Sequence, residues 1–249
     1  MNDAVFIVLE KASNVEEYDS DTFTFRRSLE LSDLTYASDM TSSAALNSLF
    51  ISDWTGKKIH KLQLNGRASK WSVGEQVHGL SMSRDESKLL ATCDAASMLK
   101  EFSARNGELI REIRLPGDVK NPFHAIELSS GNFVVSHGDH SDRLNRVVVV
   151  DARGQIVKSY GNRSFVNVPV RLAVDVDGDG SILTLNIDNP SVLFFSPMLG
   201  EFRERILQLD PKFRPRRMWL DRKHRRVFIA AHEKSIRGFV KGKLMMFQL

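Results

Sequence analysis

The 249-residue sequence contains a single cysteine and no long apolar run. With Cys93 alone, an internal disulfide framework and a zinc site made of several cysteines are both excluded. A lone cysteine is typical of a reducing compartment, and we expect a cytoplasmic protein. No stretch of about 18 apolar residues is present, so neither a transmembrane helix nor binding to a membrane is expected. No basic region precedes the first strand-like run, so we expect no secretory signal.

The sequence also lacks the short motifs of common enzymes. It has no Gly-rich phosphate loop, no Gly-x-Ser-x-Gly turn and no recognisable pair of catalytic acid and base. Apolar residues make up 42% and charged residues 27%, which is ordinary for a globular protein with a packed core. The net charge of +4 favours an acidic partner only weakly. We therefore expect a protein that is not an enzyme and that carries no cofactor.

What the sequence does contain is an internal repeat. Five segments align on a central apolar residue, and successive central residues are 40, 46, 46 and 46 positions apart. They are Met40, Leu80, Ile126, Leu172 and Met218. A period of about 40 to 45 residues is the size of one four-stranded β-propeller blade.

Each repeat carries further strand signals in a fixed order. A second apolar run follows the central residue, and a third strand comes after it. Residues 58–62 alternate between apolar and polar, which predicts a half-buried third strand. Val147 to Val150 form a continuous apolar run, which predicts burial on both faces. Glycine turns such as Asn65-Gly66 then lead into a fourth strand, because glycine tolerates the positive φ of a tight turn.

These signals predict an all-β fold, a six-bladed β-propeller of four-stranded antiparallel blades with incomplete first and last blades. Residues 4–31 would supply the second to fourth strands of the first blade, and residues 217–249 three strands of the last. We expect a single domain over residues 1–249, with blades at approximately 1–33, 34–74, 75–117, 118–162, 163–209 and 210–249. We interpret the short ends as upstream truncation. The alternative is an imperfectly closed ring, whose exposed edges invite pairing with another chain.

The fifth repeat carries a family resemblance. Val166 to Asp175, then Asp177-Gly178, then Val192 to Phe195 resemble an NHL repeat, with a proline-led first strand, a Val-Asp pair, a glycine turn and an apolar third strand. Residues 49–54 and 107–113 are similar to segments of animal NHL-like proteins. The resemblance implies a propeller used for recognition, as in tripartite-motif ubiquitin ligases, where it recruits RNA or protein. RING, B-box and coiled-coil segments are missing from this sequence, so ligase activity is not implied.

The strongest charge pattern is basic and lies near the C-terminal end. Residues 212–217 carry one lysine and three arginines, and residues 222–226 add a second basic run. Phe213 and Trp219 are interleaved, a combination that suits phosphates and bases of RNA. In the predicted topology the arginines of the first run precede a first strand, and the second run follows that strand. The two runs would therefore lie on opposite faces, and the alternative is an ordinary solvated surface.

Only the first run is thus a candidate RNA surface. Arg171 lies 46 residues before Arg217 and is its equivalent in the preceding repeat, so we add it to that surface. The candidate RNA-binding residues are Lys212, Arg214, Arg216, Arg217 and Arg171.

A second candidate surface is the segment from His137 to Asp142, predicted to be a long loop on the same face as Arg217. Its binding residues would be His137, Asp139, His140 and Asp142. Imidazole and carboxylate groups are good ligands for divalent metals, but their spacing here matches no zinc signature. We expect contact with a partner rather than a metal site.

Two weaker metal patterns are also present. His78 and His124 are predicted at equivalent positions of successive blades, but the next equivalents are Val170 and Arg216, so a third histidine ligand is missing. The run from Asp175 to Gly180 is similar to a calcium loop, but Asn186 stands where an EF-hand needs a glutamate. We interpret this run as a tight turn.

The sequence therefore predicts a non-catalytic binding or scaffold module. A protein partner comes first, because a rigid fold with variable loops suits such binding and needs no special residues. RNA comes second, through the basic residues given above. A metal-dependent hydrolase or lyase is the third alternative.

Overall fold

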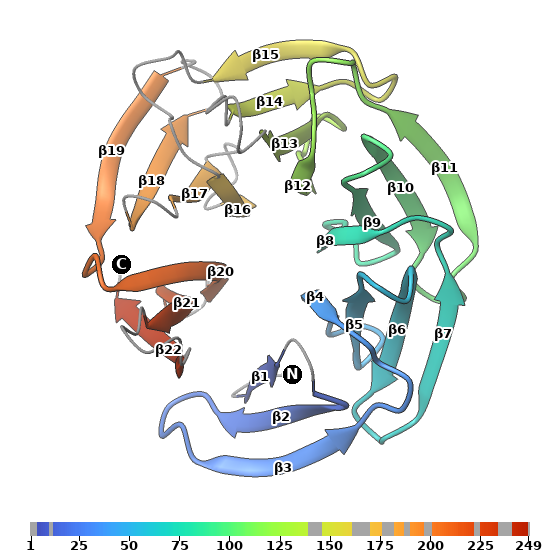
Figure 1. The fold of residues 1–249 in the computed structure, drawn as a ribbon, viewed down its shortest axis with the longest axis vertical. Coiled ribbons are helices and arrows are strands. Elements are labelled where there is room, and N and C mark those ends of the chain that lie inside the picture. The colour runs from blue at the N-terminus through green and yellow to red at the C-terminus, as the bar shows by residue number, and fades with distance from the viewer. Residues whose placement is uncertain are drawn as a thin grey trace. The chain divides into compact units, whose positions relative to one another are not determined.

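The computed structural model describes residues 4–9, 12–138, 146–160, 170–175, 182–186, 190–196, 201–221, 225–233 and 241–248. Within these ranges the chain is all-β, and its strands form six antiparallel sheets of three or four strands each (Figure 1). In the same ranges, no helix is long and apolar enough to span a membrane. The chain divides into two compact units, Met1–Arg114 and Leu115–Leu249, and each contains three of the sheets.

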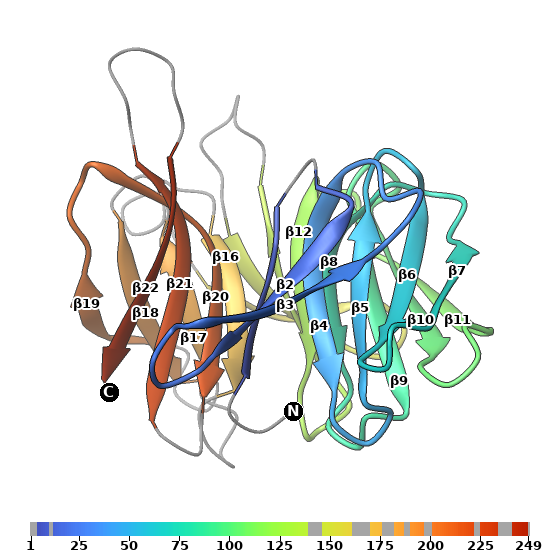
Figure 2. The same cartoon turned by 90° about the horizontal axis from the view of Figure 1, so that it is seen from below.

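The first unit holds one three-stranded and two four-stranded sheets, each of them a meander of sequential strands (Figure 2). The first sheet is β1 (Ala4–Val8), β2 (Asn14–Asp19) and β3 (Phe25–Glu30). The second is β4 (Ala37–Ser43), β5 (Ser48–Asp53), β6 (Lys58–Gln63) and β7 (Ala68–Ser72). The third is β8 (Val77–Met82), β9 (Lys88–Cys93), β10 (Met98–Ser103) and β11 (Leu109–Arg114).

The second unit follows the same plan with a short sheet at its C-terminal end. Its first sheet is β12 (Pro122–Glu127), β13 (Phe133–His137), β14 (Arg146–Val150) and β15 (Ile156–Tyr160). The next is β16 (Val170–Asp175), β17 (Ile182–Asn186), β18 (Ser191–Ser196) and β19 (Glu201–Gln208). The last is β20 (Phe213–Asp221), β21 (Arg226–Glu233) and β22 (Lys241–Gln248). These sheets confirm the predicted all-β fold of antiparallel blades, including the incomplete first and last ones.

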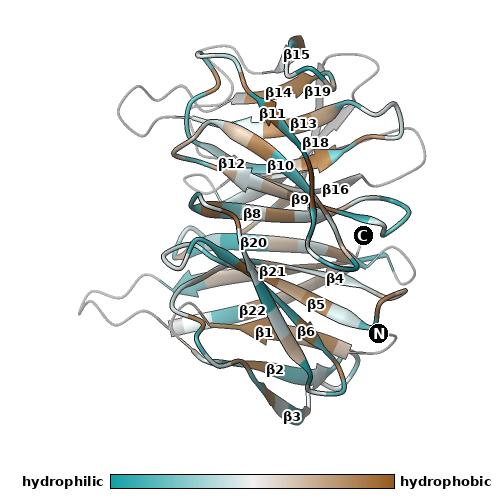
Figure 3. Ribbon diagram, turned by 90° about the vertical axis from the view of Figure 1, so that its right-hand side faces the viewer, coloured by the Kyte–Doolittle hydropathy of each residue, from teal (hydrophilic) through white to brown (hydrophobic). Residues whose placement is uncertain are grey.

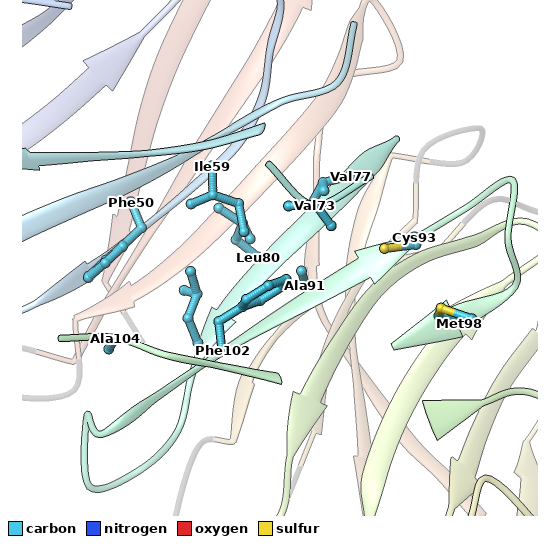
Figure 4. Packing of buried hydrophobic residues seen from close by; sticks show 11 residues of the cluster. Phe50, Ile59, Val73, Val77, Leu80, Ala91, Cys93, Met98, Phe102 and Ala104 are labelled. Atoms are coloured by element: carbon cyan, nitrogen blue, oxygen red, sulfur yellow. The ribbon is translucent and has the colours of Figure 1, made fainter. Parts of the chain in front are cut away.

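Alternation along the second strand of each sheet builds the cores between sheets. In β5, Leu49 and Ile51 pack with residues of the first sheet, whereas Phe50 packs with residues of the third. Figure 4 shows Phe50 with Phe102 of the third sheet and Ala104 of the turn after β10. Because successive side chains of a strand point to opposite faces, one strand serves two cores. Full burial of a side chain such as Phe50, which is 0% exposed, stabilises the fold by about 1.5–3 kcal/mol.

The prediction of a half-buried third strand at residues 58–62 is wrong. His60 and Lys61 are 1% and 8% exposed, because both faces of β6 are covered by neighbouring sheets. The Lys61 ammonium group donates hydrogen bonds to the carbonyl oxygens of Ala104 (3.0 Å) and Arg105 (2.8 Å), and burial lowers the pKa of Lys61. The continuous run in β14 is buried on both faces as predicted, and it is visible as a hydrophobic strand in Figure 3.

The alignment of the repeats needs a correction of one residue. A β-bulge interrupts the register near the start of four first strands, between Ala37 and Asp39 in β4 and at the same place in β8, β12 and β20. Counted from this bulge, the equivalent of Leu80 is Ala125 and not Ile126. His124 is therefore equivalent to Gly79, and the predicted equivalence of His78 and His124 is wrong. A slip of one residue moves a side chain to the other face of a sheet.

Candidate binding surfaces

A buried carboxylate organises one end of the second sheet. Asp53 is the last residue of β5 and is 0% exposed. It accepts hydrogen bonds from the backbone N–H of Thr35 (3.1 Å), Tyr36 (3.0 Å) and Gly56 (3.0 Å), and from the Thr35 hydroxyl (2.5 Å). One side chain thus ties the segment that enters β4 to the turn between β5 and β6.

The surroundings of Asp53 keep it ionised. Burial raises the pKa of Asp53, but the hydrogen bonds from Thr35, Gly56 and Tyr36 outweigh it and hold the pKa below its usual value. The Nε2 atom of His60 lies 3.6 Å from Oδ2 of Asp53. Burial lowers the pKa of His60 despite this neighbour, so the imidazole is neutral at pH 7. The network therefore carries a net negative charge.

The Asp53 network positions two aromatic side chains. Tyr36 precedes β4 and Trp54 follows β5, and the Trp54 backbone N–H donates to the Tyr36 carbonyl (3.0 Å). The two ring centroids are 6.0 Å apart at an interplanar angle of 58°. The Trp54 indole N–H donates to Oδ2 of Asp94, in the turn after β9, at 3.4 Å. Both rings are partly exposed. We call Tyr36 and Trp54 the aromatic pair.

Sequence reasoning missed the aromatic pair. The segment from Leu49 to Trp54 supported the family resemblance, but it was not considered as a site. The available signal was an aspartate at the end of an apolar run followed by tryptophan. It became informative only when the structure placed Thr35 and Tyr36, about 18 residues earlier, against that aspartate.

The predicted basic surface lies within a strand and not before it. Arg214, Arg216 and Arg217 all belong to β20, which begins at Phe213. The prediction failed because Pro215 among arginines is typical of a loop. β20 is an edge strand of its sheet, and the register shifts between Pro215 and Arg217, so the missing proline N–H and the bulge are tolerated there.

The structure brings only part of the predicted combination of cations and aromatic rings together. Phe213 is 5% exposed, and the ammonium groups of Lys212 and Lys243 lie 5.0 and 4.6 Å from its ring centroid. Its ring is therefore not an open stacking surface. Trp219 is 47% exposed, and its ring centroid lies 5.2 Å from that of Phe228.

Arg214, Arg217 and Trp219 share one face of the last sheet. They pair in register with His232, Ala230 and Phe228, which follow one another by two residues along β21. Residues that alternate by two lie on the same face of a strand. The opposite face packs on the preceding sheet through an apolar cluster that includes Leu220 and Ile229. On the face turned away from that cluster, Arg214 and Trp219 are exposed, whereas Arg217 is half-buried and donates to the Arg216 carbonyl at 3.1 Å.

The second basic run follows the end of β20, as predicted, but the first run lies within that strand, so the full length of β20 does not separate the two runs. Arg226 starts β21 and donates to Oδ2 of Asp221 through Nη2 (2.9 Å) and Nε (3.2 Å). Both residues are buried, and their charges offset each other. Arg225 is exposed, and residues 222–224 lie outside the described residues. The second run therefore offers a smaller free charge than its sequence suggests.

The predicted histidine loop is only partly described. His137 is not a loop residue, because it ends β13, pairs with Pro122 and is 4% exposed. Asp139, His140 and Asp142 lie outside the described residues. Arg171 belongs to β16, where it pairs in register with Leu185. In the described part of the chain, no three His, Cys, Asp or Glu residues are placed to hold a metal ion.

The sequence matches no protein-family model and no curated protein. Solved structures do resemble the chain. A protein of unknown function from Bacteroides caccae has a TM-score of 0.73 at 13% identity, over 92% of this chain and 82% of that one. Hydrazine synthase from Kuenenia stuttgartiensis has a TM-score of 0.69 at 14% identity, over 93% and 73%. Catalytically inactive virginiamycin B lyase from Staphylococcus aureus, solved with quinupristin, has a TM-score of 0.69 at 13% identity, over 96% and 80%.

These similarities concern the fold alone. The similar structures are multi-bladed β-propellers, and with the six antiparallel sheets they show that this chain has a β-propeller fold. Identities of 13–14% carry no substrate or reaction from those proteins to this one.

Proposed function

We propose that this chain is a non-catalytic binding module whose partner is a protein. The observation that carries the proposal is the aromatic pair, which the Asp53 network holds at one end of the second sheet. Tyrosine and tryptophan are the side chains that most often dominate the binding energy of protein interfaces. Here they are partly exposed, and their backbone is fixed before any partner arrives.

Fixing these side chains in advance favours binding. A partner that contacts a flexible loop has to order it, which costs about 0.5–1.5 kcal/mol for each immobilised side chain. The hydrogen bonds from Thr35, Tyr36 and Gly56 to Asp53 remove much of that cost in the free protein. The aromatic pair thus offers a large contact area with little loss of freedom.

The test is affinity capture followed by reconstitution. A protein captured from a cell extract by the unaltered chain would be purified and titrated against it by calorimetry. The double variant Tyr36→Ala, Trp54→Ala is expected to weaken this binding at least tenfold, because aromatic anchors contribute about 2 kcal/mol or more. Trp219→Ala is the matched control, since it removes an exposed tryptophan from the last sheet. Equal affinity of the double variant and the control would reject the proposal.

RNA binding is the second candidate, favoured by Arg214, Arg217 and Trp219 on one sheet face. Basic side chains neutralise phosphates, and an exposed indole stacks on a base. Fluorescence polarisation with short single-stranded RNAs at two salt concentrations tests this candidate. Tight binding that weakens with salt and is lost in the triple variant Arg214→Ala, Arg216→Ala, Arg217→Ala would place RNA first. The absence of binding by the folded wild type would remove it.

Three finer assignments complete the proposal. The NHL resemblance of residues 166–195 is supported by the strand order around β16 to β18, and we propose an NHL-type propeller on that basis. The lone thiol of Cys93 is fully buried, which fits the cytoplasmic location that we propose. Arg171, Asp139, His140 and Asp142 remain proposed contact residues, whereas His137 is buried at the end of β13 and is no longer one of them.

A further inference from the structure

The turn after β9 places a carboxylate beside the aromatic pair. Oδ2 of Asp94 accepts the long hydrogen bond from the Trp54 indole. Oδ1 of the same group is buried and receives no hydrogen bond from the residues that the structure describes. A carboxylate offers about four acceptor positions, so Asp94 lacks donors. Oδ1 is itself shielded from a ligand, but the Asp94 side chain is partly exposed, and its negative charge attracts a cation that approaches the exposed part.

A second carboxylate adds to the negative charge at this place. Burial, the largest cause, and the nearby charges of Glu75 and Asp94 together raise the pKa of the Cys93 thiol to about 12, against the opposing effect of Lys100. Both carboxylates lie near the end of β9, because Asp94 follows Cys93 directly and Glu75 precedes Val77, the register partner of Cys93, by two residues. In the described part of the chain neither forms an ion pair, whereas Glu112, also close to Cys93, pairs with Lys100 at 2.8 Å.

Two aromatic rings and two carboxylates, neither of them in an ion pair with any described residue, thus lie at one end of two adjacent sheets in the first unit. We call this set of residues the acidic–aromatic site: Tyr36, Trp54, Glu75 and Asp94. We propose that the acidic–aromatic site binds a basic side chain, an arginine above all, that the protein partner presents. The inference rests on the proposed function, because it names the partner's chemistry at the same surface.

The chemistry of arginine matches each part of the site. The faces of aromatic rings carry partial negative charge and attract a cation that lies over them. A guanidinium group is planar, so it can stack on an indole while its N–H groups donate to a carboxylate. Lysine supplies the charge without the planar stacking surface, and we expect it to bind less tightly. An acidic segment would be repelled by Glu75 and Asp94.

The direct test uses small probes and needs no identified partner. The protein would be labelled with 5-fluorotryptophan, and its three tryptophan signals followed by fluorine NMR, with Trp54→Phe assigning the relevant one. N-acetyl-argininamide is expected to shift the Trp54 signal in a saturable way. N-acetyl-lysinamide should act more weakly, and N-acetyl-citrullinamide, which has the same shape without the charge, should not act. The Trp71 and Trp219 signals serve as internal references.

The variant that decides the inference is Asp94→Asn, which removes the charge and keeps an oxygen for the Trp54 indole. It is expected to weaken binding of the arginine probe about fivefold. Glu108→Gln is the matched control, because Glu108 is exposed in the turn between β10 and β11 and loses the same charge. Thermal denaturation would verify that both variants fold. Equal shifts with the citrulline probe, or unchanged binding by Asp94→Asn, would overturn the inference.

Failure of this inference and failure of the proposed function give different results. If the Tyr36→Ala, Trp54→Ala variant loses the captured protein but the arginine probe does not bind, protein binding stands and the basic side chain is rejected. If the probe binds through Asp94 but capture does not depend on the aromatic pair, the site recognises a cation and the proposed function is rejected.

Discussion

The β5–β6 turn and the β9–β10 turn occupy the same place in neighbouring sheets of the first unit. Each begins after the last residue of a second strand, Asp53 in one and Cys93 in the other, and each has four residues before the next strand. Their final residues, Lys57 and Ser97, both have positive φ angles, 52° and 48°. The backbone path is therefore alike, and the two turns differ in what stabilises them.

The first turn is held by directed hydrogen bonds and the second by packing. Asp53 fixes the positions of Thr35, Tyr36 and Gly56 through its two oxygens. Cys93 belongs to the apolar cluster that includes Val77, and packing restrains position less sharply than hydrogen bonds do (Figure 4). The comparison shows why the aromatic pair sits at the first turn. The second turn leaves an oxygen of Asp94 without a donor.

The largest expected effect is the loss of the charge at the first turn. Asp53→Asn should lower the free energy of unfolding by about 3 kcal/mol, because the amide nitrogen replaces one oxygen acceptor and then faces either the N–H of Thr35 or those of Tyr36 and Gly56. Urea denaturation followed by tryptophan fluorescence measures this change. A loss below 1 kcal/mol would show that the network is not what fixes the turn.

The same carboxylate makes a prediction about pH. Because the pKa of Asp53 is lower in the folded protein than the value of about 3.9 in an unfolded chain, its ionisation stabilises the fold at neutral pH. This contribution is fully present above pH 4 and is lost as the pH falls through the folded pKa. Unfolding free energies of the wild type should therefore decline below pH 4 more steeply than those of Asp53→Asn. Parallel curves would contradict this assignment.

A smaller effect is expected where the backbone approaches Asp53. A Cβ atom on residue 56 would lie 2.3 Å from Oδ2 of Asp53, so Gly56→Ala requires the carboxylate or the turn to move. We expect a loss of about 2 kcal/mol, typical of overpacking at a buried site. Gly74→Ala is the control, because Gly74 also lies between two strands and no atom lies within 4 Å of the added Cβ. The positive φ of 81° at Gly74 strains an alanine there, so a larger loss of stability for Gly56→Ala than for Gly74→Ala measures the contact with Asp53.

The second turn should respond to polarity and not to loss of a hydrogen bond. Cys93 is 0% exposed and packs with apolar neighbours. Cys93→Ser would bury a hydroxyl group without a partner, and we expect it to cost about 1.5 kcal/mol. Cys93→Ala should cost less than Cys93→Ser if polarity and not the small cavity dominates. Thermal unfolding of both variants decides between these contributions.

Local patterns predicted the strands because each carries its own apolar signal. The run from Val147 to Val150 can be recognised as a buried strand without knowing which strands lie beside it. The register could not be read in the same way, because similar residues need not be equivalent. Ile126 was aligned where Ala125 belongs because His124 was matched with His78, whereas the bulges of β8 and β12 place His124 at the position of Gly79. The half-buried prediction for residues 58–62 failed because Lys61 satisfies its charge on carbonyl groups of the next sheet.

The candidate sites were harder to predict, because they depend on contacts between segments that are distant in the sequence, and local sequence patterns do not show such contacts. The basic run could be recognised in the sequence because its charged residues lie close together. The strand that carries them, β20, was not recognised there because it contains Pro215. The acidic–aromatic site was not visible. It joins Trp54 to Asp94, 40 residues away, and it requires Asp53 to capture Thr35 and Tyr36 first.

The smallest prediction compares the hydroxyl groups of the next-to-last residues of β5 and β9, Ser52 and Thr92. Ser52 exchanges hydrogen bonds with the backbone of Asp39, accepting from its N–H at 2.8 Å and donating to its carbonyl at 3.2 Å. Thr92 has the same position in the third sheet, where it pairs with Gly79 of β8. Its buried hydroxyl has no hydrogen-bond partner in the described part of the chain. The same position is thus satisfied in one sheet and unsatisfied in the other.

Removing these hydroxyl groups should therefore have opposite effects. Ser52→Ala is expected to destabilise the protein by about 1 kcal/mol, whereas Thr92→Val keeps the side-chain volume and should be neutral or stabilising by up to about 1 kcal/mol. Urea denaturation of both variants under the same conditions measures the difference. A Thr92→Val variant that is less stable than Ser52→Ala would mean that a buried water satisfies Thr92, and the two sheets would then be alike in polar contacts.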